Sequence, residues 1–223
     1  MLAAPTCGGF MRTFHVLAIA AFAVAAAAEP ASVKSYAELV AQAESGDAAT
    51  DYTALRMAYA ASDDYDPYGT ATGEKFNSIW PAFQAKDCAK VLPLADEMLK
   101  ADFTLVSVHV LRSDCLRTNG DGARADREEA IARGLMASLK ASGDGKSPKT
   151  AFVVVTMSEE RFLLVGLGLH EEKQSLISDG GHVYDLIEGS NEKPDGPSSA
   201  FFNVDALFAG MARQFQKPGA AAP

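Results

Sequence analysis

The chain has 223 residues, of which 48% are hydrophobic and 22% are charged, a composition typical of a folded globular protein and not of a disordered one. It carries 29 acidic and 20 basic residues, which gives a net charge of −9 at pH 7. This acidic balance argues against a protein that binds nucleic acid or an anionic membrane, because either partner needs a basic face.

The N-terminus has the pattern of a secretory signal peptide. A short basic segment begins at Met11 and precedes the apolar run 16–28, which ends in small residues before Glu29. The run is shorter than the roughly 20 residues that span a bilayer, so a cleaved signal fits better than a transmembrane anchor. We therefore predict a signal peptide over residues 1–28, with the true start at Met11 and cleavage near Ala28. The mature chain is then periplasmic or secreted, without a membrane span.

Residues 29–141 are predicted to be a helical region. Apolar residues recur at helical spacing in segments separated by turn and capping residues, and these segments are 35–45, 51–62, 76–83, 87–100, 104–118 and 124–140. Pro81 ends or kinks the third helix, and Pro93 either bends the fourth or marks its first turn. The pattern resembles stacked antiparallel helix pairs of the tetratricopeptide type, although no clean self-similarity is present. Such a stack serves as often to bind a peptide or protein as to build a small helical domain.

Two tyrosines, Tyr65 and Tyr68, lie in the turn 65–69, which also contains a proline and a glycine. They are candidates for a patch on which a ligand stacks. The alternative is that they pack the turn onto the neighbouring helices, which is the commoner role of aromatic rings.

The two cysteines that remain after cleavage, Cys88 and Cys115, are predicted to form a disulfide. They lie on consecutive helices, 13 residues before Ala101 and 13 residues after Asp102 at the predicted turn. Positions equidistant from the turn of an antiparallel hairpin lie side by side, and export would supply an oxidising compartment. A catalytic thiol is the alternative, but the sequence shows no paired histidine for it.

The turn-rich segment 142–150, SGDGKSPKT, is predicted to join the helical region to a second region. Its Gly145-Lys146-Ser147 step resembles the end of a phosphate-binding loop, but Lys140 stands where that motif needs its first glycine. A helix also precedes the segment and a strand follows it, the reverse of the order that the motif requires. We read Gly143 as a helix cap and expect neither nucleotide nor calcium here.

Residues 151–216 are predicted to be a small α+β region, followed by a flexible tail at 217–223. The expected elements are a strand at 150–156, a helix capped by Ser158, strands at 171–178, 182–188 and 199–204, and a helix at 206–216. Residues 161–167 fit either a helix or a strand. The predicted fold class is therefore α+β: an N-terminal layer of helical hairpins, then a small antiparallel sheet with one or two helices.

Several segments together resemble a known family. They are SGDGKSPKTAFVVVTMSEERFLLVGLGL from Ser142, EKQSL from Glu172, the step Tyr184-Asp185, FFNV from Phe201, and the upstream Leu55-Arg56, Tyr59, Tyr65-Asp66-Pro67-Tyr68 and His109. The chain is similar over roughly residues 51–205 to the bacterial secreted family called domain of unknown function 4919. Arg161 departs from the pattern, where an aromatic residue is expected. The resemblance implies a shared fold and export, and it implies no reaction.

Candidate catalytic residues follow from residue type alone and are His109, Glu159 and Glu160. If a site exists, we expect it where they meet Tyr65 and Tyr68. The glutamates also suit the first turn of a helix, and His109 suits a helical core, so structural roles compete with catalytic ones. No metal-ligand spacing or cofactor motif occurs.

Two functional hypotheses follow. The first is a non-catalytic binding or interaction module of the cell envelope, whose partner is a peptide, a protein or an envelope component. The alternative is a hydrolase-type enzyme whose active site matches no known motif. The sequence leaves open whether the protein has enzymatic activity.

Overall fold

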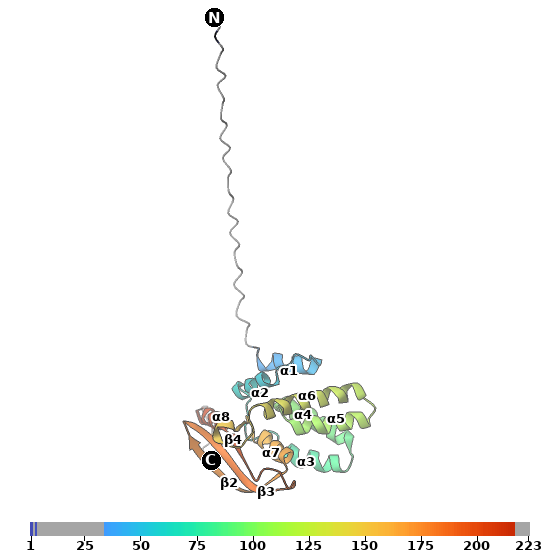
Figure 1. The fold of residues 1–223 in the computed structure, drawn as a ribbon. Helices are drawn as coiled ribbons and strands as arrows, with labels where there is room; N and C mark the ends of the chain where they lie inside the picture. The colour runs from blue at the N-terminus through green and yellow to red at the C-terminus, as the bar shows by residue number, and fades with distance from the viewer. Residues whose placement is uncertain (2, 4–33, 217–223) are drawn as a thin grey trace. The chain divides into compact units, whose positions relative to one another are not determined.

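The computed structural model describes Met1, Ala3 and residues 34–216, so the predicted tail and the rest of the predicted signal peptide lie outside the described part (Figure 1). The helices are α1 (Tyr36–Ser45), α2 (Tyr52–Ala61), α3 (Gly73–Gln84), α4 (Cys88–Ala101), α5 (Val106–Thr118), α6 (Gly122–Ala141), α7 (Met157–Leu167) and α8 (Asp205–Gln216), with a 3-10 turn at Pro148–Thr150. The strands are β1 (Phe152–Val153), β2 (Leu169–Asp179), β3 (His182–Asn191) and β4 (Ser199–Asn203). The α+β prediction is confirmed: within the described residues, six helices precede the sheet, which is mixed and not purely antiparallel as predicted. None of the helices in this described part is long and apolar enough to cross a bilayer.

Capping residues set where the helices of the N-terminal layer begin. Ser35 forms a capping box with Glu38 at the start of α1, and aspartates at positions 51, 87 and 121 accept backbone N–H groups at the starts of α2, α4 and α6. Pro81 and Pro93 both lie inside their helices, and α3 continues to Gln84. Since α4 begins at Cys88, the alternative that Pro93 marks its first turn is wrong.

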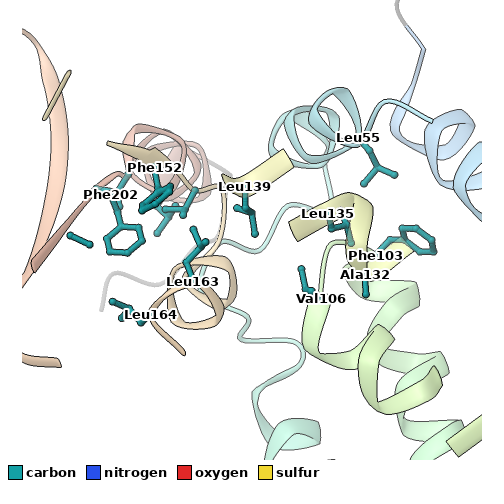
Figure 2. Packing of buried hydrophobic residues seen from close by; sticks show 14 of the residues in the cluster. Leu55, Phe103, Val106, Ala132, Leu135, Leu139, Phe152, Leu163, Leu164 and Phe202 are labelled. Atoms are coloured by element: carbon teal, nitrogen blue, oxygen red, sulfur yellow. The ribbon is translucent and has the colours of Figure 1, made fainter. Parts of the chain in front are cut away.

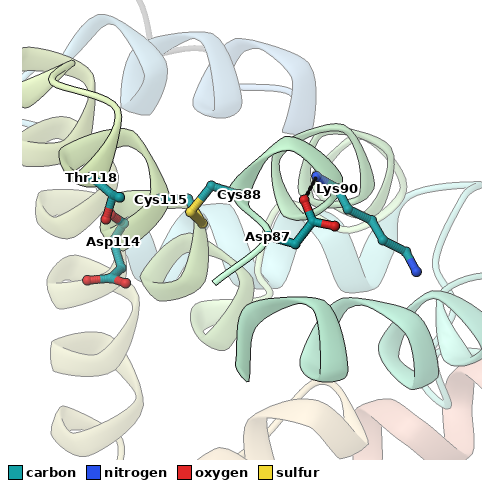
Figure 3. The surroundings of a disulfide bond; sticks show 6 residues. All are labelled: Asp87, Cys88, Lys90, Asp114, Cys115 and Thr118. Carbon is teal, nitrogen blue, oxygen red and sulfur yellow. Dashed lines mark hydrogen bonds between the residues drawn. A yellow bond between two sulfur atoms is a disulfide. The ribbon is translucent and has the colours of Figure 1, made fainter. Parts of the chain in front are cut away.

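The disulfide prediction is confirmed. Cys88 on α4 is bonded to Cys115 on α5, and their Cα atoms are 5.2 Å apart (Figure 3). Both cysteines belong to a cluster of buried apolar residues contributed by α3, α4 and α5, which we call the disulfide core; it includes Ile79, Val91, Met98, Val108 and Leu111. The hairpin geometry therefore tolerates Pro93.

The sheet has the strand order β1-β4-β3-β2. Strands β2, β3 and β4 form the expected antiparallel meander, and Gly180 and Gly181 turn the chain between β2 and β3 with φ of 58° and 86°. Strand β1 pairs with β4 in parallel and has two residues, against the seven predicted at 150–156. Val154 and Val155 are buried beyond β1, and the backbone N–H of Val155 donates to Glu159 instead of to a strand.

A single main core joins the helical layer to the sheet. Its buried residues come from α1, α2, α5, α6, α7, α8 and the strands. In Figure 2, Leu139 on α6 lies between a group around Leu135 and a group around Leu163 and the rings of Phe152 and Phe202. The two rings are tilted, with centroids 5.9 Å apart. Helices α7 and α8 thus lie against the sheet within the same core that holds the helical layer.

The choice left open for residues 161–167 is decided in favour of the helix, because α7 runs to Leu167 and ends at Gly168 with φ of 69°. Two predicted helix caps need correction. The N-cap of α7 is Thr156 and not Ser158, since the Thr156 side chain accepts the N–H of Glu159. The cap of α6 is Ser142 in a right-handed conformation, so Gly143 does not cap that helix. A Cβ atom at Gly143 would meet the Ala151 carbonyl at 2.3 Å, so glycine is needed there for a close approach of two backbones.

Candidate functional site

The loop between α2 and α3 carries both candidate tyrosines, and the structure gives them different surroundings. Tyr65 is 6% exposed; its hydroxyl donates to the carbonyl of Val155, and its ring meets Tyr59 edge-on at 5.4 Å. Burial raises the pKa of Tyr65, so the hydroxyl stays protonated as this bond requires. Tyr68 is 46% exposed, with its hydroxyl 3.8 Å from Sδ of Met211. Tyr65 packs the loop onto its neighbours, and of the two rings only that of Tyr68 is open to a ligand.

Tyr68 and Met157 form the wall between two surface pockets. The first, of about 400 Å³, lies between this wall, the sheet and α8, and its other lining residues are Gln174, Leu176, Asp185, Val204, Leu207 and Phe208. The second, of about 410 Å³, lies along α3 and α7, and its lining includes Phe76, Asn77, Arg161, Phe162 and Val165. We call the two together the Tyr68 groove and name its halves the sheet pocket and the helix pocket.

Glu159 is held by a buried ion pair. Arg56 on α2 is fully buried and donates from Nε to Glu159 Oε1 at 2.7 Å and from Nη2 to Oε2 at 2.9 Å. The guanidinium also donates to Ser138 Oγ at 3.0 Å and to the Val153 carbonyl at 2.7 Å, while the Val155 N–H donates to Glu159 at 2.7 Å. Both carboxylate oxygens are occupied, so this side chain ties α2, α6, β1 and α7 together and has no oxygen free for a substrate.

Glu160 and Asp185 form a buried pair of carboxyl groups. Glu160, in the first turn of α7, is 2% exposed, and Asp185, on β3, is 7% exposed. The two carboxyl groups are within hydrogen-bonding contact of each other, and apart from Asp185 no donor in residues 34–216 reaches Glu160 Oε2. Burial raises the pKa of Glu160 to about 8, and the charges of Asp185 and Glu171 add to the rise. The pair therefore shares one proton and carries one negative charge at neutral pH.

Asp185 connects this pair to the sheet pocket, which it lines together with Gln174. Burial raises the pKa of Asp185, and hydrogen bonds from Gln174 and from Glu160 oppose the rise. The Gln174 Nε2 group donates to Asp185 Oδ2 at 2.9 Å. Chemically, a protonated carboxyl group beside an ionised one can donate and accept a proton at neutral pH. The first turn of α7 thus contains one glutamate locked in a salt bridge and one that shares a proton.

His109 lies in a different network from the other candidates. Its ring is fully buried, with Nδ1 2.7 Å from Glu128 Oε2 and Nε2 2.9 Å from the carbonyl of Phe103. Arg112 donates to the other oxygen of Glu128 at 2.9 Å. Both ring nitrogens are engaged by protein groups, so His109 joins α5 to α6 and does not meet the Tyr68 groove.

Sequence reasoning missed another buried acid, Asp102. It is 5% exposed and accepts hydrogen bonds from the N–H and hydroxyl of Thr104 at 2.7 and 2.6 Å. Burial raises its pKa to about 7. Asp102 lines a pocket of about 430 Å³ with Asp64, Asp66, Glu97 and Lys100 among its other walls. A helix-ending Asp-x-Thr step was the available signal, but it indicates a turn and does not predict burial.

The Gly145-Lys146-Ser147 step does not form an anion-binding loop. The backbone N–H groups of Asp144 and Gly145 donate to the carbonyl of Thr150 at 2.9 and 2.8 Å, and the Lys146 N–H donates to the Asp144 side chain at 3.1 Å. These donors are used within the turn. Across the described range, no group of three or more His, Cys, Asp or Glu side chains has an arrangement that could hold a metal ion.

Comparisons with known proteins give a family and no biochemical activity. No significant match to a curated protein or to a solved structure was found. A family profile described as "Domain of unknown function (DUF4919)" matches residues 25–212, which include all of the described fold up to the third turn of α8. The match covers the Tyr68 groove and the segments on which the resemblance was based. The chain therefore belongs to the DUF4919 family.

Proposed function

We propose that the protein is exported and acts as a non-catalytic binding protein of the cell envelope, with a peptide as the ligand of the Tyr68 groove. The observation that carries the proposal is the half-exposed ring of Tyr68 between two pockets of about 400 and 410 Å³. Pockets with mostly apolar walls and a few polar groups are the usual form of ligand sites.

Export is supported by the signal-peptide pattern at residues 11–28 and by the Cys88–Cys115 disulfide, because disulfides persist in oxidising compartments. Cell fractionation followed by N-terminal sequencing tests this part. We expect the protein in the periplasm or medium with an N-terminus near Glu29. A cytoplasmic protein that keeps residues 11–28 would contradict it.

The groove is well suited to an extended ligand because its apolar surface continues past Tyr68 on both sides. Leu176 at the sheet pocket is 57% exposed, and Val165 at the helix pocket is 78% exposed. Large apolar side chains exposed next to pockets mark interaction surfaces more often than isolated ones do. The two pockets could each receive one side chain of a bound peptide, with its backbone crossing the Tyr68 ring.

A photo-crosslinking amino acid in place of Tyr68 tests the binding role in the producing cells. Trp80 on α3 is a matched control, since its ring is 53% exposed and does not line either half of the groove. We expect a defined cross-linked peptide or protein, identified by mass spectrometry, from position 68 and not from position 80. Identical products at both positions, or no product at position 68, would count against the proposal.

The second candidate is a hydrolase-type enzyme, and one observation favours it: the Glu160–Asp185 pair shares a proton beside a pocket. Such a pair resembles the acid–base arrangement of enzymes that use two carboxyl groups. Against it, only Asp185 of the two lines the pocket, so Glu160 has no direct access to a substrate there. Purified protein screened against peptide, ester and glycoside substrates tests this candidate. Turnover that Glu160→Gln and Asp185→Asn both abolish would support it, and turnover unchanged in both would remove it.

A further inference from the structure

We propose that the floor of the sheet pocket binds the basic side chain of a peptide, with the Glu160–Asp185 pair as its anionic partner. This proposal rests on the proposed function, because it names the chemistry that the Tyr68 groove recognises. It is carried by the polar groups at the pocket, by its apolar walls and by the second buried carboxyl, Glu160, in contact with Asp185.

The polar lining of the sheet pocket offers acceptors and an aromatic face. Asp185 contributes a carboxyl group to the lining. Gln174 donates an N–H to Asp185 Oδ2 at 2.9 Å, and its amide carbonyl is a further acceptor. No Lys, Arg or His is among the described residues that line this pocket. A ligand that fits such a lining is a donor with positive charge, such as an ammonium or guanidinium group.

The remaining walls suit the aliphatic stem of a basic side chain. Leu176, Leu207 and Phe208 form apolar surface around the acceptors, and the exposed ring of Tyr68 stands at the edge. Lysine and arginine bury their methylene stems on apolar surface while the charged head meets a polar partner. A cation over the face of a tyrosine gains further attraction from the ring quadrupole. The pocket combines both features within about 400 Å³.

The carboxyl of Glu160 lies against Asp185 and adds to the acidic character of this site. Its side chain is almost completely buried, and apart from the Asp185 carboxyl no donor from residues 34–216 reaches Glu160 Oε2. Buried polar atoms with so few partners are rare in native proteins. A cation bound at Asp185 would place positive charge next to this pair and stabilise ionisation of both carboxyl groups.

Nearby charges leave the floor negative. The N-terminus of α7 contributes about half a positive charge. The Glu160–Asp185 pair carries one negative charge when it holds a proton and two when the proton has left, so the sum is negative in both states. Glu171 on β2 adds repulsion, and Arg161 on α7 opposes it. Arg161 lines the helix pocket, so the two halves of the groove differ in charge. A basic ligand side chain is therefore directed to the sheet pocket.

Binding of a cation should strengthen as pH rises through the pKa of Glu160, about 8. The groups that face Glu160 are Asp185 from β3, Glu171 from β2 and Arg161 from its own helix, and Gln174 faces Asp185. A bound cation favours the doubly ionised pair, so binding releases the shared proton. The lysine side chain itself stays charged across this range, since its pKa is about 10.4.

Three peptides that differ at one position test the proposal: acetyl-Leu-Lys-Leu amide, its norleucine analogue and its glutamate analogue. Binding to the purified protein is measured by ¹⁵N NMR titration at low salt, with the Gln174 side-chain amide and the Tyr68 and Met157 amides as reporters. We expect the lysine peptide to bind about tenfold more tightly than the norleucine peptide at pH 8, the effect of one charge-assisted hydrogen bond. The preference should grow from pH 6 to pH 9.

Variants separate the site from the general charge of the protein. Combining Glu160→Gln with Asp185→Asn should remove the preference for lysine and its pH dependence while the norleucine peptide still binds. Glu44→Gln removes an exposed carboxylate from α1 and should leave the preference unchanged. Equal binding of the lysine and norleucine peptides at the groove overturns the cation proposal and keeps the proposed function. If none of the three peptides shifts the reporters, the peptide-binding groove itself is wrong.

Discussion

Glu159 and Glu160 are adjacent in the sequence and equally buried, but the protein satisfies them in opposite ways. Successive helical residues point about 100° apart, so Glu159 faces the helical layer and Glu160 faces the sheet. The first meets the guanidinium of Arg56 with two hydrogen bonds of 2.7 and 2.9 Å. The second meets the carboxyl of Asp185 and keeps a shared proton.

The difference teaches how a buried carboxyl group avoids an uncompensated charge. In a buried ion pair, a permanent partner of opposite charge compensates the carboxylate. Removing that partner strongly destabilises the fold, because the carboxylate is then buried without compensation. A carboxyl pair removes it through a proton, which depends on pH and can be displaced by an external cation. The first arrangement suits a structural joint, and the second suits a place where something binds.

The largest effect is expected from breaking the ion pair. Arg56→Met leaves Glu159 buried without a cation, which should lower the free energy of unfolding by about 3–5 kcal/mol. Urea denaturation followed by circular dichroism measures it. Adding Glu159→Gln to Arg56→Met removes the stranded charge and should recover part of the loss. An unchanged midpoint in Arg56→Met would show that the pair is not a structural joint.

Removing the disulfide should have the next largest effect and should not alter the contrast between the two glutamates. The bond links positions 27 residues apart in the disulfide core. Cys88→Ala with Cys115→Ala should lower the free energy of unfolding by about 3 kcal/mol, mainly by freeing the unfolded chain. The dependence of stability on pH should stay as in the wild type. A double variant as stable as the oxidised wild type would contradict this.

Glu160→Gln should change how stability depends on pH. The pKa of Glu160 is about 8 in the fold, against an ordinary value of 4.5, so the folded state holds a proton that the unfolded state has lost between these values. Stability from this group is therefore complete below pH 4.5 and declines as pH rises to about 8. In Glu160→Gln the decline between pH 5 and pH 8 should be smaller by about 3 kcal/mol.

Asp102, whose pKa is raised to about 7, contributes a decline of the same sign that remains in this variant. Chemical denaturation at pH 5, 6.5 and 8 measures both slopes. Glu44→Gln serves as the exposed control and should keep the wild-type slope. Equal slopes in wild type and Glu160→Gln would mean that the carboxyl pair does not hold a proton.

The smallest effects on stability should come from substitutions of the two tyrosines. Tyr65 is buried and has a structural hydrogen bond, whereas Tyr68 is half-exposed at the groove. Tyr65→Phe removes the donor to the Val155 carbonyl and should cost about 1 kcal/mol. Tyr68→Ala removes a half-exposed ring and should change stability by no more than about 0.5 kcal/mol. Thermal denaturation compares them, and the peptide titration should show weakened binding only for Tyr68→Ala. The reverse pattern would assign the ligand surface to Tyr65.

The features that the sequence predicted correctly are governed by neighbours along the chain. The Cys88–Cys115 bond follows from equal distances to one hairpin turn, and the helix starts at Asp51 and Asp87 follow from capping by the residue itself. The antiparallel meander follows from the turn at Gly180 and Gly181. Each of these features is set by the backbone geometry of a short segment, which can be inferred from the residues of that segment alone.

Tertiary structure alone decided what surrounds the two glutamates. Arg56 is 103 residues from Glu159, and Asp185 reaches Glu160 from a different strand, so no periodicity or spacing could pair them. The same holds for the end of β1: the Val154 N–H still donates to Asn203 of β4, but the Val155 N–H donates to Glu159. The sequence by itself determined that two acidic side chains begin α7. Only the packing of α2 on one side and β3 on the other decided that one became a structural joint and the other a titratable pair beside the Tyr68 groove.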